Sequence, residues 1–318
     1  MFKLITLIHL LIILALHPGI SFAQEDNIVP GVSTISISDA RQSAIAFVNS
    51  NTSPGLEGAT LELNEEGRQS TNWRSSLGFN AEFTLRNYIF DGYWGLAVVG
   101  GELKDDIDLI GDQGETVKLN LRRQVVALRG SFGLSFPIDQ HFKLRPYLSL
   151  VASELRTNFS YENLSDPLLS GSRSTSAWMY STVGTIEAIY FQWYGQYKLE
   201  LDAFYHLIYT DSFSEDNPIL ATYDWNDSIK LEANFSGATK LNTQGRPWRW
   251  HIYGNYINFL SHNESALGYT QLIEVGAGLN WQMNIKPLDW FGWQSLGIRI
   301  GFIYGEDVEG YNFGLTAQ

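Results

Sequence analysis

Apolar and polar residues alternate one by one along most of this chain from about Leu61 onward. Between Trp73 and Arg86 the odd positions are mostly apolar and the even positions mostly polar or charged, and residues 197–209 and 273–284 repeat the pattern. Successive side chains of a β-strand point to opposite faces. Each of these segments is therefore predicted to be a strand with one face suited to lipid and the other to water.

Twelve segments carry a strand pattern. They are residues 58–64, 73–86, 92–104, 116–136, 141–160, 174–192, 196–212, 228–240, 247–261, 270–285, 294–305 and 310–318. An even number of antiparallel strands can close on itself without leaving an edge. The predicted fold is all-β, a transmembrane antiparallel up-and-down β-barrel of about 12 strands over residues 58–318.

Three of these segments depart from simple alternation. Between residues 116 and 136 the apolar positions change from odd to even, which predicts either a β-bulge near Arg122-Arg123 or a first half that projects beyond the membrane. The third and ninth segments are apolar on both faces in places, and the sequence offers no reason for this.

The connections between the segments alternate between two kinds. Those from odd to even strands, at residues 65–72, 105–115, 161–173, 213–227, 262–269 and 306–309, are long and acidic. Those from even to odd strands are short and flanked by aromatic residues such as Trp193 and Tyr194. Outer-membrane barrels have short periplasmic turns and long outer loops, and Tyr and Trp favour the membrane boundary. The pattern predicts an outer-membrane barrel with acidic loops outside and both termini in the periplasm.

The chain begins with a predicted signal peptide at residues 1–23. Lys3 precedes an apolar stretch at residues 4–16, and Ser21 and Ala23 are small residues placed for cleavage before Gln24. The stretch is too short to span a membrane. Residues 24–57 form a separate N-terminal segment, in which Ser38 or Asp39 can cap a short helix that ends near Asn49. This helix either plugs the barrel lumen or lies in the periplasm.

Composition narrows the function classes. The chain is 44% hydrophobic and 14% aromatic, which is too polar for a helical membrane bundle and aromatic enough for a barrel. It has no cysteine, so disulfides and thiol chemistry are excluded. A net charge of -13 argues against a nucleic-acid partner.

No residue set predicts a cofactor or a metal site. The six histidines form no close-spaced ligand set. The acids Asp105, Asp106 and Asp108 lack the spacing of a calcium loop and are interpreted as a solvated loop. A hydrolase built into the barrel wall would need a fixed Ser, His and acid at one height, with His206 or His262 as candidates. The chain is expected not to be an enzyme.

Charged side chains on the water-facing sides of the strands are predicted to line the lumen. They are Arg74, Glu82, Arg86, Arg129, Lys143, Arg145, Lys198, Glu200, Asp202, His206, Lys230, Glu232, Glu274 and Arg299. One interpretation is that they form cross-strand ion pairs that fill and stiffen the lumen. The other is that they line a narrow pore, in which mixed signs would give weak ion selectivity.

The order of elements and the aromatic last strand, Tyr311-Asn312-Phe313-Gly314-Leu315, resemble the translocator domain of autotransporters, in particular solitary autotransporter-like barrels of Gram-negative bacteria. The resemblance covers residues 38–318. It implies contact with outer-membrane lipid and lipopolysaccharide, and a C-terminal strand that the barrel-assembly machinery reads. The chain departs from this family in two ways. At most 15–30 residues precede the helix, so no passenger is expected, and the chain ends Thr316-Ala317-Gln318 rather than on an aromatic residue.

The predicted function is an outer-membrane barrel without a passenger, with a structural or narrow-pore role. The alternatives are a barrel-wall hydrolase acting on lipid or peptide, and an adhesin that binds through its acidic loops. Nothing in the sequence marks a substrate or a subunit interface.

Overall fold

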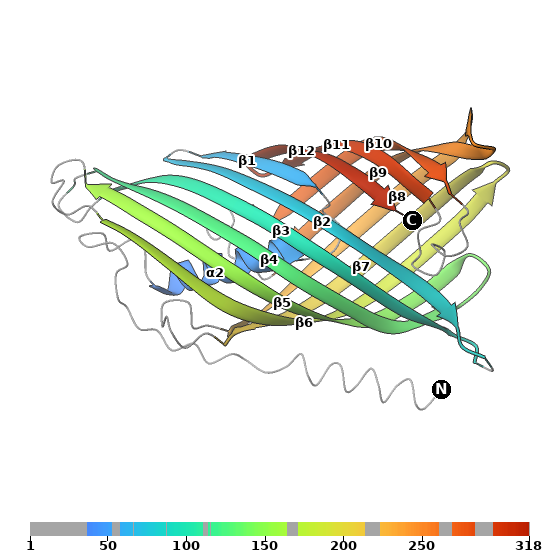
Figure 1. Ribbon diagram of the computed structural model, residues 1–318, viewed down its shortest axis with the longest axis horizontal. Helices are drawn as coiled ribbons and strands as arrows, with labels where there is room; N and C mark the ends of the chain where they lie inside the picture. The colour runs from blue at the N-terminus through green and yellow to red at the C-terminus, as the bar shows by residue number, and fades with distance from the viewer. Residues whose placement is uncertain are drawn as a thin grey trace.

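The fold is a closed antiparallel barrel of twelve strands. The computed structural model describes residues 37–52, 58–65, 67–86, 88–110, 114, 116–163, 171–213, 223–260, 269–283 and 295–317. Each strand pairs with its neighbours in the chain, and the first pairs with the last (Figure 1). The predicted fold class and strand number are confirmed. The predicted signal peptide lies outside the described residues.

One helix precedes the strands. The elements are α2 (Ile37–Thr52), β1 (Ala59–Glu65), β2 (Arg68–Thr84), β3 (Asp91–Ile110), β4 (Thr116–Pro137), β5 (Phe142–Asn163), β6 (Gly171–Tyr194), β7 (Tyr197–Ser212), β8 (Tyr223–Thr243), β9 (Arg246–Phe259), β10 (Gln271–Gln282), β11 (Ser295–Gly305) and β12 (Val308–Ala317). Among the described residues, no helix is long and apolar enough to cross a membrane.

The wall of the barrel is much taller on one side than on the other. Strand β6 has 24 residues, whereas β12 has 10 and β1 has 7. A transmembrane strand needs about 9–11 residues. The strands β3 to β6 therefore extend well past a bilayer at the end that carries the β1–β2 hairpin (Figure 1).

This extension explains the change of phase in β4. The strand pairs with β3 in one unbroken register, and its odd positions face the lumen throughout. Its outward positions are polar up to Gln124 and apolar from Val126 onward. The predicted bulge near Arg122-Arg123 is wrong, because the faces never exchange. What changes is the surroundings of the outer face. From Val126 onward this face belongs to the apolar band, which is the lipid-facing belt of apolar residues around the barrel, and up to Gln124 it lies beyond that band.

The acidic segment 105–115, predicted to be a loop, is in large part strand. Strand β3 continues to Ile110. Ile107 and Leu109 point inward and pack against Val117 and Leu119 of β4. Asp105 is 2% exposed and accepts hydrogen bonds from Arg68 and Ser70. Acidic residues suggested a loop, but paired strands can bury a carboxylate when a guanidinium and a hydroxyl satisfy it.

The lumen-facing apolar residues of the third and ninth strands have a structural reason. Helix α2 lies inside the barrel, and its residues from Ala44 to Ser50 are all buried (Figure 1). Leu103 of β3 packs in one cluster with this helix, and Ile257 of β9 packs in a second. Their inner faces are apolar because they contact a helix rather than water.

Candidate functional site: the lumen and its helix

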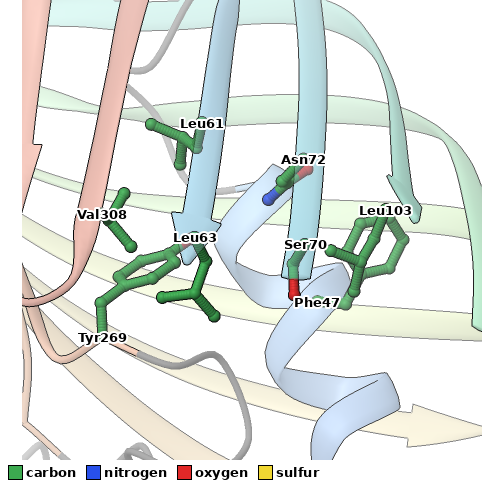
Figure 2. Close-up of a pocket in the computed structure, with 8 residues that line it drawn as sticks. All are labelled: Phe47, Leu61, Leu63, Ser70, Asn72, Leu103, Tyr269 and Val308. Atoms are coloured by element: carbon green, nitrogen blue, oxygen red, sulfur yellow. The ribbon is translucent and has the colours of Figure 1, made fainter. Parts of the chain in front are cut away.

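Helix α2 enters the lumen from the end of the barrel that carries the β1–β2 hairpin. Only residues 53–57 separate the helix from Gly58, the residue before β1, so the C-terminal end of the helix lies near the start of β1. In Figure 2 the helix runs antiparallel to β1 and passes behind β2, with Phe47 beside Leu103. The helix therefore lies within the lumen, toward that end of the barrel (Figure 1).

Three hydrogen bonds orient the helix against the wall. Arg74 Nη1 donates to the backbone oxygen of Ser50 (2.7 Å), and Arg123 Nη1 donates to Ser43 Oγ (2.5 Å). Thr210 Oγ1 donates to Asn49 Oδ1 (2.7 Å). The last carbonyl groups of a helix have no partner within the helix and carry partial negative charge. Arg74 therefore satisfies a backbone carbonyl group in the last turn of the helix.

Apolar packing holds the middle of the helix. Phe47 is fully buried and shares a cluster with Leu103, Val125 and Leu155. Ala46 belongs to a second cluster on the opposite wall, formed mainly by β1, β9 and the last strands. The cavity left beside Phe47 measures about 20 Å³ (Figure 2), which is room for about one water molecule. Little free space therefore remains beside Phe47 on this side of the helix.

Between the helix and the short turns, the lumen is charged. Glu82 accepts hydrogen bonds from Lys143 Nζ (2.8 Å), Arg145 Nη2 (2.5 Å) and Ser135 Oγ (2.9 Å). Arg145 also donates to Glu187 Oε2 (2.8 Å). These residues come from β2, β4, β5 and β6, so the network joins four strands. Such ion pairs stiffen the wall, because each one holds two strands in register.

A second charged group lies on β7 and β8. Lys198 pairs with Glu200, and Lys230 pairs with Glu232 at 2.6 Å. Asp202 lies between the two pairs and belongs to no salt bridge among the residues that the structure describes. The two charged groups enclose a cavity of about 490 Å³. Its lining consists of Asn80, Lys143, Arg145, Glu187, Ile189, Phe191, Trp193, Lys198, Glu200, Asp202, Phe204 and Glu232. We call this cavity the vestibule.

A third group lies on the last strands. Glu274 is 2% exposed and accepts hydrogen bonds from Tyr253 Oη (2.7 Å), Asn255 Nδ2 (3.1 Å) and Asn312 Nδ2 (2.8 Å). Arg299 lies over the ring of Tyr253, with 5.4 Å from its central carbon to the ring centroid. A buried carboxylate is tolerated here because three donors surround it.

The structure brings most of the predicted lumen residues into these groups. Arg129 lies on the inner face of β4, and His206 is 2% exposed with Nδ1 2.9 Å from Thr185 Oγ1. Arg86 is different. It lies in the exposed turn after β2, because that strand ends at Thr84.

Sequence reasoning missed Arg123 and Glu187. Both point into the lumen and contact the helix or the charged network. The odd-position pattern of β4 would have found Arg123 if the strand had been treated as one continuous register. Within the described ranges, no three His, Asp or Glu side chains converge to hold a metal ion. His262, the other hydrolase candidate, lies outside those ranges.

Comparisons with known proteins agree on the fold. No protein-family model and no curated protein matches the chain. The beta domain of the Bordetella autotransporter BrkA aligns with 82% of this chain and 96% of its own, with a TM-score of 0.51 and 12% identity. This chain has the fold of an autotransporter translocator barrel. The predicted resemblance is confirmed at that level.

Two other solved structures align with lower scores. The translocator domain of the autotransporter NalP from Neisseria meningitidis covers 86% of this chain and 91% of its own, with 9% identity and a TM-score of 0.44. The CymD monoaromatic hydrocarbon channel covers 93% and 96%, with 9% identity and a TM-score of 0.42.

Proposed function

We propose that this chain is a plugged outer-membrane barrel with a structural, non-enzymatic role, in which helix α2 keeps the lumen closed. The observation that carries the proposal is the burial of every helix residue from Ala44 to Ser50. A helix lying outside the barrel, in the periplasm, would leave one face in water.

Apolar packing offsets part of the conformational entropy that ordering the helix costs. Burying a large apolar side chain contributes about 1.5–3 kcal/mol, and Ile45, Phe47 and Val48 are each at most 1% exposed. Ordering the helix costs conformational entropy of about 1–2 kcal/mol per residue when it has to fold from coil. The three hydrogen bonds from Arg74, Arg123 and Thr210 then fix the depth of the helix in the lumen and its rotation about its own axis.

The outer surface supports a position in the outer membrane. The proposed orientation has the tall strands β3 to β6 and the acidic connections outside, and the end of β12 at the periplasmic boundary. Arg122 and Arg156 lie on the outer face of the tall wall, with the pairs Arg122–Glu102 and Arg156–Glu154. Cations at this height suit contact with lipopolysaccharide phosphates, and the C-terminal strand is the proposed signal for the barrel-assembly machinery. In this orientation the helix begins at the outer mouth, whereas β12 ends in the periplasm.

A narrow pore is the second candidate, and the vestibule favours it. It is large enough for hydrated ions, and its paired charges would give weak selectivity. Conduction would require the helix to leave its level of the lumen. A hydrolase receives less support from the described residues, because His206 is buried against Thr185.

Planar-bilayer recordings test the proposal. The full chain is expected to show no regular conductance steps, and a chain lacking residues 24–55 is expected to show discrete ones. A Gln42→Ala variant, altered on an exposed part of the helix, serves as the control and should behave like the full chain. Equal step sizes in the full and shortened chains would overturn the plug. Lipase or protease turnover that His206→Ala abolishes would overturn the non-enzymatic role.

A further inference from the structure

Strand β1 closes the barrel over only part of its height. Residues Ala59–Leu63 pair with Val308–Asn312 of β12, and residues Thr60–Glu65 pair with Arg68–Trp73 of β2. The last contact toward the periplasmic end is the hydrogen bond that the Phe313 N–H donates to the Gly58 carbonyl (3.1 Å). Figure 1 shows β1 as a short strand between two longer neighbours.

Beyond that contact, two strand edges face each other, and no strand of the described residues lies between them. Strand β2 from Arg74 to Thr84 pairs with β3 alone, and β12 from Gly314 to Ala317 pairs with β11 alone. No other described strand pairs with either edge. We call this gap the seam.

The register of β1 gives the width of the seam. Trp73 and Tyr311 both pair with Thr60, so residue i of β2 lies opposite residue i + 238 of β12. Continued by four residues, this relation places Leu77 opposite Leu315. Two strand spacings separate such residues, or about 9.6 Å between backbones. At the strand spacing that β1 sets, the seam is one strand wide.

The seam lies at the depth of the hydrocarbon. On its outer face Leu77 is 66% exposed and Leu315 is 65% exposed, and both belong to the apolar band. Backbone N–H and C=O groups without partners cost several kcal/mol each in lipid. Lipid chains carry no donor or acceptor that could satisfy these groups. An extended peptide carries both, along both of its edges.

We propose that the seam is a docking site for an extended segment of another polypeptide. The segment adds as a strand in line with β1 and antiparallel to both β2 and β12, and its backbone satisfies both edges. Its alternate residues are apolar where they face lipid beside Leu77 and Leu315. The others are polar or small, because they face Ser76 and Gly314 on the lumen side. This interaction goes beyond the plugged-barrel function and does not depend on it.

Cysteine pairs test the width of the seam, and the chain has no native cysteine to interfere. In the full chain folded into phosphatidylcholine vesicles, a Leu77→Cys/Leu315→Cys pair should form no disulfide, because its backbones lie beyond the about 7 Å limit. A bis-maleimide of about 10 Å span should bridge it. The control pair Leu77→Cys/Val98→Cys joins residues that are direct partners on β2 and β3, so it should oxidise readily. Equal oxidation of the two pairs would show that β2 and β12 meet directly, and the proposal would fall.

A second experiment tests whether a peptide occupies the seam, by measuring how well it protects the Leu77→Cys/Leu315→Cys pair from bis-maleimide bridging. The probe is a synthetic peptide copied from Ile273–Leu279 of β10, whose side chains alternate as the seam requires. It should slow bis-maleimide bridging of the Leu77→Cys/Leu315→Cys variant at least tenfold. The same peptide with every second amide N-methylated should not protect, because it cannot donate to one edge. If neither peptide or both peptides protect, backbone pairing is not what fills the seam, and lipid is the occupant instead.

Discussion

Replacing Phe47 by alanine should loosen the plug. The Phe47 ring is fully buried between the helix and Leu103, Val125 and Leu155, with only about 20 Å³ of free space beside it. Truncating a buried phenylalanine costs about 3–5 kcal/mol, because packing is lost and a cavity remains. Since the ring joins the helix to the wall, most of this cost falls on docking. At about 1.4 kcal/mol per factor of ten, the undocked population should rise by roughly two to three and a half orders of magnitude.

Single-channel recording in planar bilayers measures this population. The Phe47→Ala variant should show brief openings with the step size of the chain that lacks residues 24–55, and the open fraction should rise with temperature. Phe47→Leu keeps most of the volume and should raise the open fraction much less. If Phe47→Ala opens no more often than Gln42→Ala, the helix is not what closes the lumen.

Three further predictions concern the wall. Asp105→Asn removes one partner of a buried ion pair with Arg68 and should destabilise the tall wall by about 3 kcal/mol, measured by urea unfolding in detergent micelles. Hydrogen bonds from the Gln271 amide and Thr270 lower the pKa of the Glu306 carboxyl in the β11–β12 turn. The resulting stability should be present above about pH 4.3 and lost as pH falls below it, seen as lower hydrogen-exchange protection of the Thr270 amide. Gly58→Ala should weaken barrel closure, because Gly58 has a φ of 68° and an added Cβ would collide with the Phe313 carbonyl oxygen; heat-dependent migration on gels reports it.

Each of these predictions has a matched control. Replacing both Arg68 and Asp105 by leucine should recover much of the stability, because no unpaired charge remains. Glu306→Gln should make protection of the turn insensitive to pH, and a pH effect that persists would place its origin elsewhere. Gly130→Ala, at a site with open space for a Cβ, should leave barrel closure unchanged. Equal effects of the Gly130 and Gly58 substitutions would contradict the steric argument.

The barrel was predictable because its main signal is local. Whether a residue of β7 or β10 faces lipid or lumen depends only on the pleat of its own strand, which has a period of two. The alternation of Ile273, Glu274 and Val275 therefore specified both faces without any knowledge of the neighbouring strands. The helix was predictable for the same reason, since the apolar residues after Asp39 are a short-range feature. Its predicted cap was wrong, because the helix begins at Ile37 and Ser38 and Asp39 lie inside it.

The ends of the strands were harder to predict, because acidic residues at a strand end resemble those of a solvated loop. Asp105, Asp106 and Asp108 suggested a solvated loop, yet all three belong to β3. Whether an acidic residue can sit in a strand depends on what pairs with it. For Asp105 that partner is Arg68, which only the register between β2 and β3 brings close.

By itself, the sequence determined that the chain forms twelve strands with a lipid face and a lumen face, preceded by one helix. The tertiary structure decided that the helix lies in the lumen, that Glu82 meets Arg145, and that β1 closes the wall over only part of its height. These outcomes depend on register and closure, which set the distance between residues far apart in the chain, such as Asn49 and Thr210. No local periodicity carries that information, because it arises only when the last strand meets the first.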